Sequence, residues 1–144
     1  MMKNIASLEE LQEEARQLVS TLTPHTEHAT LLTLSGELGA GKTAFTKALG
    51  EVLQVGETVT SPTFIMMKVY ETKKEWPKRL VHIDAYRLSS GRELSPLHFD
   101  ELYADKDNLI VLEWPEQVKD TLPSADVAAT LSLGEEESRT IVYG

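Results

Sequence analysis

Residues 30–43 read Thr-Leu-Leu-Thr-Leu-Ser-Gly-Glu-Leu-Gly-Ala-Gly-Lys-Thr, and the part from Gly36 onward fits the pattern G-x-x-x-x-G-K-[ST] of a phosphate-binding loop. The glycines allow backbone torsions in which successive N–H groups point at phosphate oxygens. In this pattern Lys42 brings a cation to the β- and γ-phosphates, and the Thr43 hydroxyl is a ligand for Mg²⁺. The predicted nucleotide-binding residues are Gly36, Glu37, Leu38, Gly39, Ala40, Gly41, Lys42 and Thr43.

The segments on both sides of this loop suit that interpretation. Leu31, Leu32 and Leu34 lie in a short apolar run that is typical of a buried strand. After the loop, apolar residues recur at helical spacing as far as about Gln54, and Gly56 is the predicted end of that helix. The phosphates would therefore meet a helix N-terminus, where free N–H groups and the helix dipole favour anions.

Length and composition limit the classes of protein to consider. The chain has 144 residues, which predicts one domain over residues 1–144, and it has no cysteine, which excludes disulfides, thiolate metal sites and a cysteine nucleophile. We find no secretory signal and no run of ~18–20 apolar residues, so we expect a cytoplasmic protein without membrane contact. The formal charge of −9 makes the chain a poor stand-alone binder of nucleic acid, so a role in such a pathway requires a partner.

The N-terminal part predicts a helix and a loop. Ser7 and Glu10 form a capping box, and the apolar stripe that follows predicts a helix over residues 8–22. His25 and His28, in the next loop, have a spacing seen in metal sites but no third ligand, and we interpret them as solvated.

The remaining pattern predicts the fold class. Strands are expected at residues 64–70, 80–84, 109–113, 126–133 and 138–143; we expect the first to be covered on both faces and the last two to form a hairpin. Residues 92–103 are helical or irregular and broken by Pro96, and Pro115 begins a short helix. The order predicts an α/β, P-loop NTPase-like fold, with a parallel central sheet flanked by antiparallel strands and helices.

Two of these strands end in carboxylates, Asp84 and Glu113. Ligands of open α/β sheets bind beyond the carboxyl ends of the strands, so both should lie beside the glycine-rich loop. ATP hydrolysis needs a bound metal, an in-line water and charge stabilisation. We assign Thr43 and Glu113 to Mg²⁺, and Lys42 and Asp84 to catalysis, with Asp84 orienting the water. The roles of Asp84 and Glu113 could be exchanged, and either carboxylate could instead cap a loop.

Three further features lie near this predicted site. Ser61 and Thr63 flank a proline where many phosphate-loop proteins keep a segment that senses the γ-phosphate, and a plain turn is the alternative. Trp114 follows the metal carboxylate and is expected to pack in the core. Arg87 is either a charge stabiliser or an ion-pair partner. The chain has no [NT]-K-x-D segment for guanine and little room for the lid of a nucleotide kinase.

Four segments in this order resemble the TsaE (YjeE) family of small bacterial ATPases required for making threonylcarbamoyladenosine on tRNA. They are residues 35–43, Ser61-Pro-Thr-Phe64, His82-Ile-Asp-Ala-Tyr-Arg87 and Leu112-Glu-Trp-Pro115. The resemblance implies a parallel core sheet with antiparallel flanks, and a Mg²⁺-dependent ATPase that is weak alone. It implies partners like the transferase TsaD and its companion TsaB, contact with tRNA only through them, and modification of adenosine 37 in tRNAs that read A-starting codons.

By the same resemblance the ATPase is not itself the transferase, and its turnover resets the complex between rounds. Glu10 and Arg139 are implied to lie by the nucleotide. The chain departs from the family at Leu11, where Thr is frequent, and at Ala85, where Leu is commoner. A reading from another class is an ATP-gated binding module whose hydrolysis is incidental, and a third reading is a small-molecule kinase.

Overall fold

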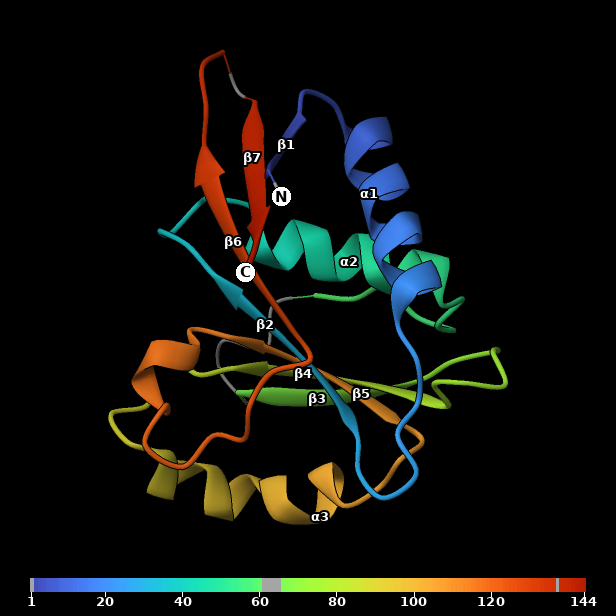
Figure 1. The fold of residues 1–144 in the computed structure, drawn as a ribbon, viewed down its shortest axis with the longest axis vertical. Coiled ribbons are helices and arrows are strands. Elements are labelled where there is room, and N and C mark those ends of the chain that lie inside the picture. The colour runs from blue at the N-terminus through green and yellow to red at the C-terminus, as the bar shows by residue number, and fades with distance from the viewer. Residues whose placement is uncertain (1, 61–65, 137) are drawn as a thin grey trace.

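The computed structural model describes residues 2–60, 66–136 and 138–144 (Figure 1). In this part of the chain one sheet has the strand order β1-β7-β6-β2-β5-β4-β3. The strands are β1 (Met2–Ile5), β2 (Thr30–Ser35), β3 (Met67–Glu71), β4 (Arg79–Asp84), β5 (Asn108–Glu113), β6 (Val127–Leu133) and β7 (Arg139–Tyr143). Strands β4, β5, β2 and β6 run parallel, whereas β3, β7 and β1 pair antiparallel. The predicted sheet, with parallel strands at its centre and antiparallel strands at its edges, is confirmed.

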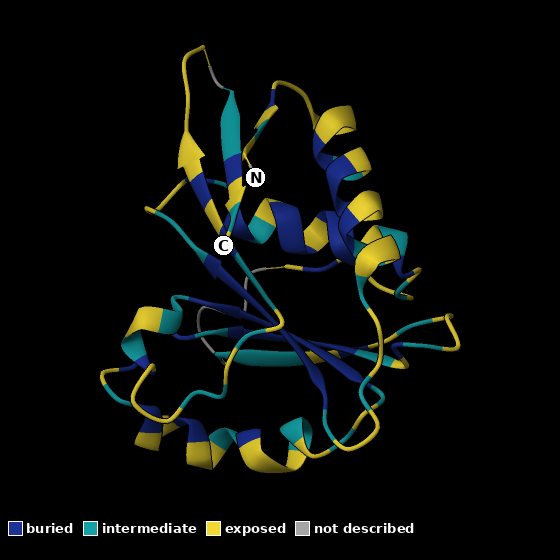
Figure 2. Ribbon diagram, in the orientation of Figure 1, coloured by how far each residue is buried: buried dark blue, intermediate teal, exposed yellow. Residues whose placement is uncertain are grey.

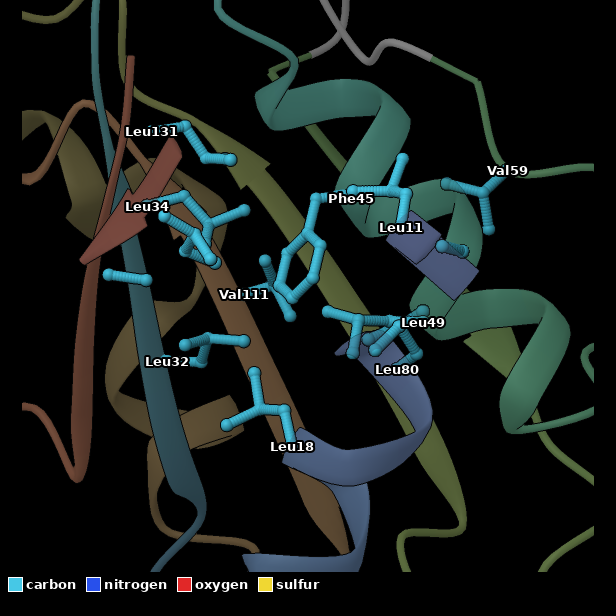
Figure 3. Packing of buried hydrophobic residues seen from close by; sticks show 14 of the residues in the cluster. Leu11, Leu18, Leu32, Leu34, Phe45, Leu49, Val59, Leu80, Val111 and Leu131 are labelled. Carbon is cyan, nitrogen blue, oxygen red and sulfur yellow. The ribbon is translucent and has the colours of Figure 1, made fainter. Parts of the chain in front are cut away.

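Helices cover the sheet on two sides (Figure 1). On one side lie α1 (Leu8–Thr21) and α2 (Lys42–Val52); on the other lie the 3₁₀ helix η1 (Gly91–Leu97) and α3 (Phe99–Tyr103), and the short 3₁₀ helix η2 (Pro115–Gln117) follows β5. The central strands are buried while the outer helix surfaces are exposed (Figure 2). Figure 3 shows Phe45 of α2 pointing toward Leu34 and Val111 of the sheet, within the core on the α1–α2 side.

Successive side chains of β4 and β5 point to opposite faces of the sheet, and each face carries its own hydrophobic core. Leu80, Leu109 and Val111 lie in the core beneath α1 and α2, whereas their chain neighbours, such as Val81 and Ile110, lie in the core beside η1 and α3. Because side chains on one face of a strand recur every second residue, the strand ends place polar residues on the α2 side of the sheet. The register pairs Asp84 directly with Glu113 there.

The first helix has the expected cap. The Ser7 hydroxyl accepts from the Glu10 N–H at 3.1 Å, and the Glu10 carboxylate accepts from the N–H of Ala6, one residue before the cap, at 2.5 Å. Strand β1, immediately upstream, was absent from the predicted elements; it pairs with β7.

Two predictions about α2 and β3 are wrong. Gln54, with φ 57°, takes the left-handed conformation after α2, and the Val55 N–H donates to the Gly50 carbonyl, so Gly56 does not end the helix. Strand β3 lies at the edge of the sheet, and Val69 on it is 37% exposed, so it is not covered on both faces. An apolar run shows neither which strands become neighbours nor which strand stays at the edge.

The histidines of the loop after α1 are also not simply solvated, which corrects that interpretation. His25 Nε2 lies 2.6 Å from Asp126 Oδ1, and the His25 and His28 rings are 4.1 Å apart. The His28 ring stacks on Tyr103 at 4.9 Å. Asp126 also accepts from the Leu31 N–H, so the cluster holds the start of β2 in place.

No helix in the described ranges combines the length and apolarity that crossing a bilayer requires.

Candidate functional site

The loop Gly36–Thr43, called the glycine loop below, joins β2 to α2. All three of its glycines have positive φ: 140° at Gly36, 80° at Gly39 and 104° at Gly41. A Cβ at Gly36 would lie 2.2 Å from the Leu131 carbonyl oxygen of β6, so this position has room only for glycine. Helix α2 begins at Lys42, directly after Gly41. The first turn of α2 therefore directs free N–H groups at the space above the loop.

Lys42 is turned into this loop. Its Nζ donates to the carbonyls of Gly36 at 2.5 Å and Glu37 at 2.8 Å, and it lies 4.3 Å from the ring centroid of Trp114. Burial lowers the pKa of Lys42, and the negative charges of Glu113 and Asp84 act in the opposite direction. The site thus holds a cation that is partly desolvated and faces two carboxylates.

Glu113, at the end of β5, meets the start of α2. Its side chain is buried, with the residue only 3% exposed, and its Oε2 accepts from the Thr43 hydroxyl at 3.3 Å. The same oxygen lies 2.5 Å from Nε2 of His82, a wholly buried residue of β4. A buried carboxylate requires such partners because its desolvation is costly.

Asp84, at the end of β4, is half-buried beside Glu113. Its Oδ1 accepts from the Tyr86 N–H at 3.0 Å, which turns the chain away from the strand. Burial raises the pKa of Asp84; the Tyr86 hydrogen bond and the nearby His82 and Lys42 oppose this rise, while Glu113 adds to it. Asp84 is therefore a carboxylate with a shifted proton affinity at the edge of a cavity, which is common at functional sites.

Two cavities adjoin the glycine loop. One, of about 310 Å³, opens between the loop and the strand ends and includes Lys42, Thr43, Asp84 and Glu113, with Trp114 as a wall. The other, of about 330 Å³, lies between the loop and the N-terminal and C-terminal strands. Its lining includes Ile5, Leu11, Ala44, Leu131 and Arg139, and Gly41 borders both cavities.

The structure brings most of the predicted site residues together. The part of the glycine loop from Leu38 to Thr43, except Ala40, lines the first cavity together with Asp84 and Glu113. Ala40 and Arg139 line the second cavity. Glu10 is not in either lining, because its carboxylate turns back to the N–H of Ala6. Ser61 and Thr63 lie outside the described residues.

Two residues at the site have roles that sequence reasoning missed. The Trp114 side chain packs against the core beside η1 and α3, as expected, but it also covers Lys42. The main-chain N–H of Trp114 donates to the Leu34 carbonyl at the end of β2. His82 was not singled out for chemistry. The sequence does contain a clue to its role: His82 lies in an apolar strand two residues before Asp84, so both side chains are on the same face of that strand.

The oxygen donors present suit a hard cation. A Mg²⁺ ion at a nucleotide takes one or two carboxylates together with phosphate oxygens and waters, and Thr43 and Glu113 supply a hydroxyl and a carboxylate side by side. Within residues 2–60, 66–136 and 138–144 no cluster of three or more histidine and acidic side chains forms a metal cage.

The family model described as "Threonylcarbamoyl adenosine biosynthesis protein TsaE" matches residues 5–141. The chain belongs to the TsaE family. Proteins named tRNA threonylcarbamoyladenosine biosynthesis protein TsaE are similar to it: that of Streptomyces coelicolor is 51% identical over 87 residues, covering 60% of this chain and 57% of the relative. That of Bacillus subtilis is 30% identical over 131 residues, covering 91% and 79%.

The match to some TsaE relatives is partial, because the chain spans 57% of the Streptomyces protein and 65% of the Haemophilus influenzae protein. The solved structure titled as the crystal structure of Bacillus subtilis YdiB is similar over 99% of this chain and 83% of its own, with a TM-score of 0.74 and 26% identity. This likeness and the observed sheet confirm the predicted α/β fold class.

Proposed function

We propose that this chain binds and hydrolyses ATP in the pathway that forms threonylcarbamoyladenosine on tRNA. The observation that carries the proposal is the glycine loop at the start of α2, with Thr43 in contact with the buried Glu113 and with Asp84 alongside. Three glycines with positive φ, a lysine and a helix N-terminus form an anion-binding concavity. Two carboxylates at its rim suit a metal-assisted hydrolysis of a phosphoanhydride.

The loop N–H groups hold the phosphates, and Lys42 turns from the carbonyls of Gly36 and Glu37 to the phosphate oxygens. Thr43 and Glu113 hold Mg²⁺, which when bound offsets the charge on the phosphates. This exchange of partners by Lys42 keeps a buried cation paired throughout, which avoids the cost of an isolated charge.

Asp84 orients the water that attacks the γ-phosphate. Its place at the end of β4 puts it beside Glu113 in the cavity that contains Lys42 and Thr43. Its raised pKa suits a group that accepts a hydrogen bond from water and takes up a proton late in the reaction. The exchanged assignment, with Asp84 at the metal, instead expects Asp84→Asn to raise the Mg²⁺ concentration that ATP binding requires.

The second cavity takes the nucleoside. It shares Gly41 with the phosphate cavity, and its apolar lining and Arg139 suit a base and ribose. Glu10, whose side chain caps α1, borders this region only through its neighbours Ser7, Leu8 and Leu11. A direct contact between Glu10 and the nucleotide therefore requires the side chain to leave the Ala6 N–H.

The transfer of the threonylcarbamoyl group to adenosine 37 belongs to partners in this proposal. A chain with a formal charge of −9 does not attract tRNA, so a TsaD-like transferase and a TsaB-like companion handle the nucleic acid. ATP turnover by this chain resets that complex between rounds.

The decisive experiment compares Lys42→Ala and Asp84→Asn in ATP binding, phosphate release and a reconstituted tRNA modification assay. Lys47→Ala, an exposed lysine on the same helix, is the control. We expect Lys42→Ala to lose binding, and Asp84→Asn to bind ATP without hydrolysis and to fail in multiple turnover. If Asp84→Asn supports multiple turnover, the chain is an ATP-gated binding module. Phosphate transfer to an acceptor instead of water would identify a kinase.

A further inference from the structure

His82 is a polar side chain with no solvent exposure, on the strand that carries Asp84. On its face of β4 the preceding residue is Leu80, in the core, and the following one is Asp84, in the site. A buried imidazole is costly unless its nitrogens find partners. The other buried residues of β4 are the aliphatic Leu80, Val81 and Ile83, so a histidine among them needs a reason beyond filling space.

The two ring nitrogens of His82 have different surroundings. Nε2 lies 2.5 Å from Glu113 Oε2, the oxygen that also accepts from Thr43. Nδ1 is buried and has no hydrogen-bond partner among the described residues. Within the described part of the chain, the ring is therefore held at one end only, by the carboxylate of the predicted metal site.

This contact fixes the direction of the hydrogen bond. An ionised carboxylate only accepts hydrogen bonds, so Nε2 must donate. Glu113 Oε2 therefore accepts from both the His82 ring and the Thr43 hydroxyl.

We propose that His82 is a positioning residue that fixes the Glu113 carboxylate for Mg²⁺. The inference depends on the proposed nucleotide site. The Nε2 donor holds one oxygen in place, and Glu113 Oε1 accepts no hydrogen bond from any described residue, so it stays available as a ligand. Outer partners of this kind orient the ligands of metal sites.

The first test reads the ring directly in the full-length protein without nucleotide. Nitrogen-15 NMR of the imidazoles, assigned with His82→Gln, distinguishes the four histidines and shows which nitrogen of His82 carries hydrogen. We expect hydrogen on Nε2. An Nε2 without hydrogen overturns the proposal, because the ring then cannot donate to Glu113.

The second test separates Mg²⁺ binding from nucleotide binding. The affinity for a fluorescent ATP analogue is measured in EDTA and across a Mg²⁺ titration, in wild type, His82→Leu, His82→Gln and the control Leu80→Met. Loss of an outer partner costs metal affinity about 10- to 100-fold, so His82→Leu should need at least about tenfold more Mg²⁺ while binding the analogue equally well in EDTA. His82→Gln, whose amide still donates, should recover most of the difference.

The outcomes separate this inference from the function on which it depends. An unchanged Mg²⁺ requirement in His82→Leu, or an equal loss of affinity with and without Mg²⁺, leaves His82 a structural residue and overturns the positioning role. The absence of any nucleotide binding by the wild type removes the proposed function instead. If His82→Leu does not fold, the NMR of the wild type still decides whether Nε2 donates to Glu113.

Discussion

Replacing Gly36 by alanine is expected to destabilise the protein more than replacing Gly39, although both glycines have positive φ. At Gly36 the new methyl group would lie 2.2 Å from the carbonyl oxygen of Leu131, which belongs to the main chain of β6. At Gly39 nothing lies within 4 Å of the same atom. The two substitutions thus share a backbone penalty and differ in one steric contact.

The magnitudes follow from these contacts. A left-handed backbone costs an alanine about 1–2 kcal/mol, which both variants pay. Non-bonded heavy atoms are best about 3.5 Å apart, so only Gly36→Ala must also push β6 away by roughly 1 Å. Forcing an extra methyl group into a packed interior costs about 1–3 kcal/mol. Since domains have about 5–15 kcal/mol of stability, both variants should fold.

Urea unfolding, followed by circular dichroism, measures the difference. The free energy of unfolding of Gly36→Ala should be about 1–3 kcal/mol below that of Gly39→Ala, with similar denaturant dependence in both. ATP affinity should fall more in Gly36→Ala as well, because the Gly36 carbonyl helps to position Lys42. Equal stabilities of the two variants, within about 0.5 kcal/mol, would show that the contact with β6 does not constrain the loop.

Three other substitutions test separate parts of the structure. Burial raises the pKa of Asp84 above its ordinary 3.8, so the folded protein loses stability as pH rises through the raised pKa. In thermal scans Asp84→Asn should therefore have a higher melting temperature than wild type at pH 7. This difference in melting temperature should vanish below pH 3.8, where the aspartate is protonated in both states. Tyr143 donates to the buried Glu14 at 2.5 Å, so Tyr143→Phe should cost about 1.5–3 kcal/mol in urea unfolding. Arg139→Ala, which removes a cation from the second cavity, should weaken ATP binding roughly tenfold by calorimetry, and unchanged affinity would remove Arg139 from the nucleotide site.

The sequence predicted the parts of the site that follow from local pattern. A glycine-rich turn between an apolar run and a helical run indicates where a loop meets a helix N-terminus. The parallel strands end on the same edge of the sheet, so the acids after two such runs were expected together, and Asp84 and Glu113 are register partners. Neither inference required knowledge of which strands lie next to each other in the rest of the sheet.

The parts that sequence reasoning missed depend on contacts between distant segments. Strand β1 has only four residues and is a strand because β7, at the other end of the chain, pairs with it. Strand β3 looks like a central strand from its apolar run, but its exposure follows from its place at the edge. The role of His82 depends on Glu113, 31 residues away, and a single histidine in a strand does not indicate its partner.

The site is an extension of the core, and this explains both its rigidity and the free energy that its buried carboxylates cost the fold. On one face of the sheet, β4 runs from Leu80 through His82 to Asp84, and β5 runs from Val111 to Glu113. Aliphatic packing therefore fixes the polar ends to the main chain of two parallel strands, as a precise phosphate site requires. The same placement removes carboxylates from water, and the raised pKa of Asp84 is a direct expression of that penalty. A substitution that relieves the penalty should stabilise the fold and impair the chemistry together, because both effects arise from the same buried charge.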